Sequence, residues 1–180
     1  MSTLSICVFC SASSKVAREY QNLAVEVGAY IARNSCRTVY GGSRAGLMGL
    51  VADSALKHGG EVAGVIPDFL IKNEIAHDQL TELYVTKTMH ERQMKMAELA
   101  DIFLVLPGGL GTMAEFFEVI TWKVLGIHSK PVYVLNAHGY WDEMLDMIKK
   151  AQNENFMHYD SENIFEIICD LNQINLSIDK

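Results

Sequence analysis

Cysteine and proline are scarce in this chain of 180 residues, which has four cysteines and three prolines. Four cysteines are too few for the disulfide framework that stabilises many small secreted proteins. Cys7 and Cys10 form a C-x-x-C pattern, but they lie in an expected strand, where residues three apart point to opposite faces. We therefore interpret them as ordinary buried thiols. The few prolines form no linker, and we find no internal repeat.

Long apolar runs and clustered positive charge are also missing. No run approaches the roughly 18 apolar residues that a membrane span needs, and the start Met1-Ser-Thr-Leu-Ser-Ile6 lacks the features of a signal peptide. We therefore expect a cytoplasmic protein with no membrane partner. The 15 lysines and arginines are scattered and outweighed by 22 acidic residues, for a formal net charge of −7, so we expect no nucleic-acid partner.

Two kinds of catalytic motif are absent as well. The six histidines form no pair at metal-ligand spacing and no cluster with cysteines, so we expect no metal. No Gly-x-Ser-x-Gly elbow is present, which argues against the serine hydrolases that use one. The hydrophobic fraction of 49% can fill one core, and 180 residues are too few for two ordinary domains, so we expect a single domain over residues 1–180.

Short apolar, β-rich runs alternate with amphipathic helical patterns along the chain. This alternation predicts an α/β fold, a doubly wound parallel sheet with helices on both faces. The expected strands are residues 4–9, 38–40, 61–66, 80–85, 101–106 and 131–135. The expected helices are 14–34, 45–58, 89–100, 112–125 and 140–154, with a last short helix near 161–172. The one long irregular stretch is 67–79, and such a loop is often functional.

The strongest motif is Leu106-Pro-Gly-Gly-Leu-Gly-Thr-Met-Ala-Glu115, a glycine-rich turn between a buried strand and an amphipathic helix. Glycines let the backbone approach a ligand, and the helix that follows adds its positive dipole end. Thr112 can cap this helix and offer its hydroxyl to phosphate. The turn therefore predicts a phosphate site. A tight turn without a ligand does not readily explain three glycines and a threonine.

The same turn fits a looser dinucleotide-binding pattern, Gly109-x-Gly111-x-x-Ala114. That interpretation requires an acidic residue after the next strand to hold a ribose, but Asn136-Ala-His138 stands there. The motif also comes late in the chain rather than after its first strand. A nicotinamide or flavin enzyme is therefore disfavoured.

A second glycine turn, Tyr40-Gly-Gly-Ser-Arg-Ala-Gly-Leu-Met-Gly49, also joins a strand to a helix. It lacks the Gly-Lys-Ser/Thr ending of a P-loop, so it predicts no nucleoside triphosphatase. Gly41 and Gly42 can line the ligand cleft, whereas Gly46 and Gly49 can equally serve close helix packing.

Two charged residues near these turns have alternative interpretations. Arg92, in Met89-His-Glu-Arg92, can hold a carboxylate or phosphate with its planar guanidinium, or it can be a solvated surface group. Glu115 lies three residues after Thr112 on the same helical face. Its carboxylate can be catalytic, or it can simply complement the positive end of the helix.

These motifs, in this order and spacing, resemble the Lonely Guy family of cytokinin riboside 5′-monophosphate phosphoribohydrolases, whose members are often mislabelled lysine decarboxylases. The resemblance runs from about Ile6 to Phe156. It implies a Rossmann-like fold, a homodimer, no cofactor, and hydrolysis of a purine nucleoside 5′-monophosphate to free base and ribose 5-phosphate.

The resemblance also implies roles for particular residues. Arg92 and Glu115 match the family's catalytic pair, and Glu74 and Thr121 match substrate-contacting positions. The phosphate-binding turn matches Gly108, Gly109, Leu110, Gly111 and Thr112. Thr121 is six residues beyond Glu115, or about 600° around a helix, so it should lie off the face of Glu115.

This chain departs from the family pattern in two places. Gln93 stands where members usually have lysine, which removes a positive charge beside the substrate. Cys10-Ser-Ala12 replaces Cys-Gly-Ser. The alternative function is a non-catalytic nucleotide-binding or signalling module that uses the same turn. A pyridoxal-phosphate lysine decarboxylase is improbable, because no motif for a Schiff-base lysine is present.

Overall fold

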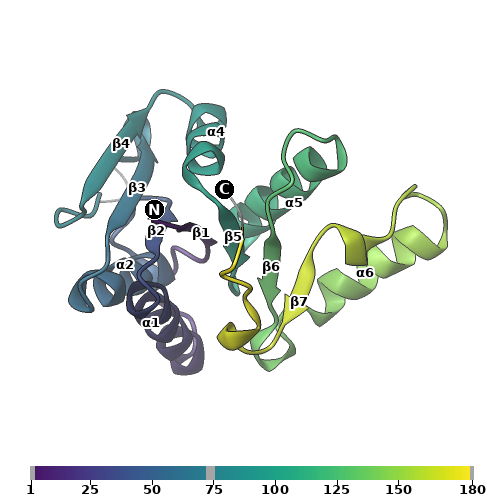
Figure 1. Ribbon diagram of the computed structural model, residues 1–180, viewed down its shortest axis with the longest axis horizontal. Coiled ribbons are helices and arrows are strands. Elements are labelled where there is room, and N and C mark those ends of the chain that lie inside the picture. The colour runs from purple at the N-terminus through teal and green to yellow at the C-terminus, as the bar shows by residue number, and fades with distance from the viewer. Residues whose placement is uncertain (1–2, 72–75, 179–180) are drawn as a thin grey trace.

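The computed structural model describes residues 3–71 and 76–178. Its centre is a sheet of seven strands, all parallel, in the order β4-β3-β2-β1-β5-β6-β7 (Figure 1). The strands are β1 Ser5–Phe9, β2 Arg37–Tyr40, β3 Val62–Pro67, β4 Glu82–Thr86, β5 Ile102–Val105, β6 Val132–Leu135 and β7 Glu166–Ile168. The strand order reverses between β1 and β5. The predicted doubly wound, Rossmann-like parallel sheet is confirmed.

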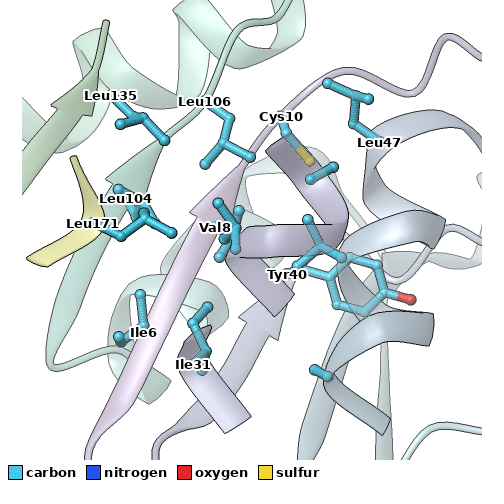
Figure 2. Close-up of a cluster of buried hydrophobic side chains, with 14 of the residues drawn as sticks. Ile6, Val8, Cys10, Ile31, Tyr40, Leu47, Leu104, Leu106, Leu135 and Leu171 are labelled. Atoms are coloured by element: carbon cyan, nitrogen blue, oxygen red, sulfur yellow. The ribbon is translucent and has the colours of Figure 1, made fainter. Parts of the chain in front are cut away.

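Helices cover both faces of the sheet (Figure 1). The helices are α1 Arg18–Arg33, α2 Gly46–Lys57, α3 Asp68–Ile71, α4 Met89–Leu99, α5 Leu110–Val124 and α6 Asp142–Asn153. Helices α1 and α2 pack on one face, in the cluster shown in Figure 2, where Ile6 and Val8 of β1 lie near Ile31 of α1. Helices α4, α5 and α6 pack on the other face, over side chains such as Phe103. None of the helices in the described ranges is long and apolar enough to cross a membrane.

The two cysteines of the C-x-x-C pattern belong to different clusters. Cys7 packs under α4 and α5, whereas Cys10 packs under α1 and α2. Both are buried, free thiols, as predicted. Burial raises the pKa of both thiols well above the usual range, and the negative charge of Glu115 raises each further.

The expected last helix, 161–172, is wrong. The segment instead holds two short 3-10 turns, Ser161–Asn163 and Leu171–Gln173, on either side of β7. In β7, Glu166 and Ile167 are exposed and Ile168 is buried, and the strand pairs in parallel with β6. Asp170 then begins a new turn, because its side chain and that of Gln173 form a capping box.

Helices α1, α3 and α5 also differ from expectation. Helix α1 begins at Arg18 rather than at residue 14, because Ser11 and Ser13 accept backbone N–H groups of the loop before it. The short helix α3 occupies the start of the stretch expected to be irregular. Helix α5 begins at Leu110, two residues earlier than expected.

Candidate active site

Arg92 is buried in the first turns of α4 and points at two strand ends. Its Nε donates to the carbonyl oxygen of Val65 at 3.1 Å, and its Nη2 donates to that of Gly41 at 3.2 Å. The start of α4 is set by Thr88, whose hydroxyl accepts the N–H of Glu91. A surface position for this guanidinium, one of the two interpretations from sequence, is therefore wrong. Arg92 is held by the carboxyl ends of β2 and β3.

Glu115 faces Arg92 from the neighbouring helix. The distance from Arg92 Nη1 to Glu115 Oε1 is 3.6 Å, and both side chains are buried. Glu115 itself lies one turn beyond the glycine-rich start of α5. The structure thus brings the two predicted catalytic residues together, at the sheet edge where ligands bind in open parallel sheets.

The start of α5 carries no side-chain cap. Gly109 is the N-cap residue, and the first intrahelical bond runs from the N–H of Met113 to the carbonyl of Gly109 at 3.0 Å. The N–H groups of the residues before Met113 therefore lack helical partners. Leu110 is 84% exposed, and Gly109 and Gly111 are exposed. This open helix end combines free donors with a positive dipole, which suits an anion.

Thr112 does not cap this helix, contrary to the prediction. It is the third helical residue, it is buried, and its side chain packs on Gly108. A Cβ on Gly108 would lie 2.1 Å from Thr112 Oγ1, so any other residue at position 108 requires the buried threonine to move. Thr112 is not the cap because the helix already begins at Leu110, after the extended backbone of Gly109.

Gly109 and Gly111 differ from Gly108 in their surroundings. A Cβ built on either would meet no atom within 4 Å, and neither has the positive φ that favours glycine. The folded chain itself therefore does not require glycine at these two positions. Close approach of a ligand to the backbone would require it.

The second glycine turn lies beside Arg92. A Cβ on Gly41 would lie 2.0 Å from Arg92 Nη2, and Gly42 has a φ of +76°. The carbonyl of Gly42 accepts the N–H of His77 at 3.0 Å. Gly46 and Gly49 approach other backbone segments closely, with a built Cβ at 2.3 Å from Ala12 and 2.1 Å from Arg44.

The other residues that were predicted to contact substrate differ in whether the structure places them beside the Arg92–Glu115 pair. Gln93 follows Arg92 on α4 and is half-buried. Thr121 is exposed and donates its hydroxyl to the carbonyl of Phe117 at 2.6 Å, so the structure does not bring it to the Arg92–Glu115 pair. Glu74 lies outside the described residues.

Sequence reasoning missed two side chains that support the site. His77 is buried, its Nδ1 accepts the N–H of Gln79, and its Nε2 lies 3.0 Å from Asp53 Oδ1. Tyr140 donates its hydroxyl to the carbonyl of Gly108 at 2.8 Å. Neither residue belongs to a motif, and only the fold reveals their partners. The one available signal was that Tyr140 follows a strand end.

No group of three or more His, Cys, Asp or Glu side chains that could hold a metal ion occurs within residues 3–71 and 76–178. A groove of about 770 Å³ lies between α6 and β7, with Asp146, Lys149 and Glu166 among its lining residues. Its lining includes none of the residues of the two glycine turns, nor Arg92 or Glu115. The groove is therefore separate from the candidate active site.

Comparisons with known proteins agree with this architecture. A solved structure of the molybdenum cofactor carrier protein of Chlamydomonas reinhardtii matches with a TM-score of 0.72 and 21% identity, covering 94% of this chain and 91% of the other, which shows the shared fold. A family model described as "Possible lysine decarboxylase" matches residues 48–177, more than half of the chain.

Curated relatives are more similar. The cytokinin riboside 5′-monophosphate phosphoribohydrolase of Rhodococcoides fascians is 49% identical over 154 residues, which are 85% of this chain and 78% of that protein. An Arabidopsis thaliana enzyme of the same name is 46% identical over 153 residues, or 84% of this chain and 70% of that protein. The chain therefore belongs to the family of cytokinin riboside 5′-monophosphate phosphoribohydrolases, the Lonely Guy family.

Proposed function

We propose that this protein hydrolyses the N-glycosidic bond of a purine nucleoside 5′-monophosphate, releasing the free base and ribose 5-phosphate. Family membership makes it an N-glycosyl hydrolase and favours this reaction over a non-catalytic nucleotide-binding module. The observation that carries the proposal is on one helix: α5 begins with an open glycine turn and, one turn later, presents Glu115 to Arg92.

The glycine turn is proposed to hold the 5′-phosphate. The uncapped N–H groups of Gly109, Leu110 and Gly111 are donors of the kind that phosphate oxygens accept, and the helix dipole adds a favourable field. The phosphate is remote from the bond that breaks. Binding energy gained there aligns the ribose for reaction, so that the reacting carbon is held near Glu115.

Glu115 is proposed to act on the ribose. Cleavage of the bond between C1′ and the base nitrogen leaves the bonding electrons on the base and positive charge on the ribose, as in glycosidases. The Glu115 carboxylate stabilises this charge and accepts a proton from the water that attacks C1′, and the departing base takes up a proton. The products then balance as base plus ribose 5-phosphate.

Arg92 is proposed to orient Glu115 and the ribose hydroxyls. Two of its N–H groups are used by the carbonyls of Val65 and Gly41, which fix the plane of the guanidinium. Nη1 is directed at the carboxylate, 3.6 Å away. Because its two backbone partners are uncharged, the positive charge of Arg92 remains available to Glu115 and to the substrate.

The proposal is tested by incubating the protein with AMP and with isopentenyladenosine monophosphate and following base and ribose 5-phosphate by chromatography. We expect release from at least one substrate, and we expect Glu115→Gln to bind nucleotide but lose about 10² to 10⁴ of kcat. Equal turnover of AMP and adenosine would refute the phosphate anchor, and near-normal kcat in Glu115→Gln would remove Glu115 from its role. Tight AMP binding without any release would favour the binding module.

We also propose that one domain, residues 1–180, carries the whole site, that the protein is cytoplasmic, and that it forms a homodimer. Support for the dimer comes from large apolar side chains that are exposed on or next to α4 and α5. They are Met89, Met94, Leu110, Phe117 and Leu125. Packing such side chains against a second copy of the chain would remove apolar surface from water. Sedimentation equilibrium should give twice the chain mass, and a monomer would refute this part.

A further inference from the structure

Tyr140 contacts the proposed phosphate-binding turn through a single hydrogen bond. Its hydroxyl donates to the carbonyl oxygen of Gly108 at 2.8 Å, although the two residues are 32 positions apart. Gly108 is thus held from two sides, because Thr112 packs against its Cα. The residue that begins the glycine turn is therefore fixed both by packing and by a bond to its carbonyl.

The bond to Gly108 also sets the direction of the next N–H group. A peptide unit is planar and trans, so the carbonyl of Gly108 and the N–H of Gly109 point in opposite directions; no cis peptide bond occurs among the described residues. With the carbonyl turned to Tyr140, the N–H of Gly109 is turned away from it. It is one of the uncapped donors at the start of α5.

The segment that carries Tyr140 is itself held firmly. Asn136 accepts the N–H of Trp141 at 2.8 Å and donates to Asp142 Oδ1 at 2.7 Å, which closes the turn after β6. The adjacent Trp141 side chain is buried and anchors this turn in the core. His138 and Gly139 both have positive φ and reverse the chain direction. These contacts fix the turn that carries Tyr140, and so they fix the position of its hydroxyl relative to Gly108.

We infer that Tyr140 is a positioning residue for the 5′-phosphate subsite, acting by orienting the Gly108–Gly109 peptide. The inference rests on the proposed function, since it concerns the phosphate of that substrate. Preorganised donors bind an anion more tightly than donors that must first be ordered, because the ordering cost is already met in the free protein. The residue has no part in the chemical step at the base.

The test compares Tyr140→Phe with Tyr20→Phe. Tyr20 lies edge-on to Tyr140 with ring centroids 5.6 Å apart, and no hydrogen bond of its hydroxyl occurs among the contacts of the described residues. Each variant thus removes one hydroxyl from the same aromatic group, but only one loses the bond to Gly108. Both variants keep their rings, and thermal melting verifies that they fold.

We expect Tyr140→Phe to raise the KM for AMP about tenfold, or about 1.4 kcal/mol. The inhibition constant of inorganic phosphate should rise by the same factor. The kcat for AMP should change less than twofold, because bound AMP still has its phosphate held by the remaining donors and its ribose aligned. The kcat/KM for adenosine should also change less than twofold, because adenosine carries no phosphate. Tyr20→Phe should match the parent protein in all four quantities.

A purely structural role of Tyr140 would lower the melting temperature without changing the KM for AMP, and that result overturns the inference. Equal losses with AMP and adenosine overturn it as well. If the parent protein releases no base from AMP or from isopentenyladenosine monophosphate, the proposed function fails, and calorimetric affinities for AMP and inorganic phosphate replace KM. Tyr140→Phe must then weaken both ligands about tenfold relative to Tyr20→Phe for the inference to stand.

Discussion

Gly111→Ala should change stability and substrate binding in opposite directions. Gly111 lies in the first turn of α5, and its added Cβ would meet no atom within 4 Å. Because alanine restricts the unfolded chain more than glycine does, the free energy of unfolding should rise by about 0.4–1 kcal/mol. For a chain of this size, that gain corresponds to a rise in melting temperature of roughly 1–4 °C.

The same methyl group projects into open space at the start of α5, and it points toward the N-terminal end because the Cα–Cβ bonds of a helix tilt that way. A phosphate bound there would have to move away and would lose one hydrogen bond to a charged partner, worth about 1.5–3 kcal/mol. The KM for the nucleotide should therefore rise about 10- to 100-fold, with a smaller effect on adenosine.

Calorimetric melting and steady-state kinetics on the same preparation measure both effects. Gly108→Ala is the matched control, since its Cβ would collide with Thr112 and should lower both stability and activity. A stabilised Gly111→Ala protein with an unchanged KM would refute the reasoning, because phosphate would then bind elsewhere. A destabilised Gly111→Ala protein would contradict the open surroundings of Gly111 on which the stability prediction rests.

The remaining predictions concern the buried Arg92 and the half-buried His128. Arg92→Lys should lower kcat about 100-fold and the free energy of unfolding by about 1–3 kcal/mol. The reason is that an ammonium cannot donate to the carbonyls of Val65 and Gly41 and also contact Glu115. An unchanged kcat would contradict this. Burial lowers the pKa of His128, so its neutral form stabilises the fold above its unfolded pKa of about 6.5, and this stability is lost as the pH falls from there through the lower folded pKa. His128→Asn keeps an acceptor for the N–H of Lys130 but does not titrate, so urea unfolding should show a smaller loss of stability between pH 7.5 and 5 than in the parent protein. An equal loss in both proteins would exclude His128 as the titrating group.

The fold was predictable because its strands are apolar and well separated. The run Ile102–Val105 is entirely apolar, which predicts a central strand covered on both faces, and all four side chains are buried. In contrast, β7 is a three-residue edge strand with only one buried side chain. Its sequence has no period long enough to separate strand from helix, and only its pairing with β6 decides the outcome.

The candidate site was predictable where glycines and charges form a local motif. The start of α5 and the two charged side chains could be named from sequence, but the burial of Arg92 could not. Its partners are the main-chain carbonyl oxygens of Gly41 and Val65. Every residue type has such a carbonyl, so no sequence pattern predicts these contacts. The same holds for Tyr140, whose partner is the carbonyl of Gly108.

The strand order has a consequence for how activity appears during refolding. Strands β2 and β3, which hold Arg92, lie on one side of β1, whereas β5, which leads into the helix of Glu115, lies on the other. Within the sheet, the two halves are joined by the pairing of β1 with β5, in which Ile6 lies opposite Ile102. Parallel pairings between strands so distant in sequence form slowly, because a long loop must close first. Recovery of enzymatic activity should therefore lag behind the recovery of helical circular dichroism and report the moment at which the sheet becomes continuous.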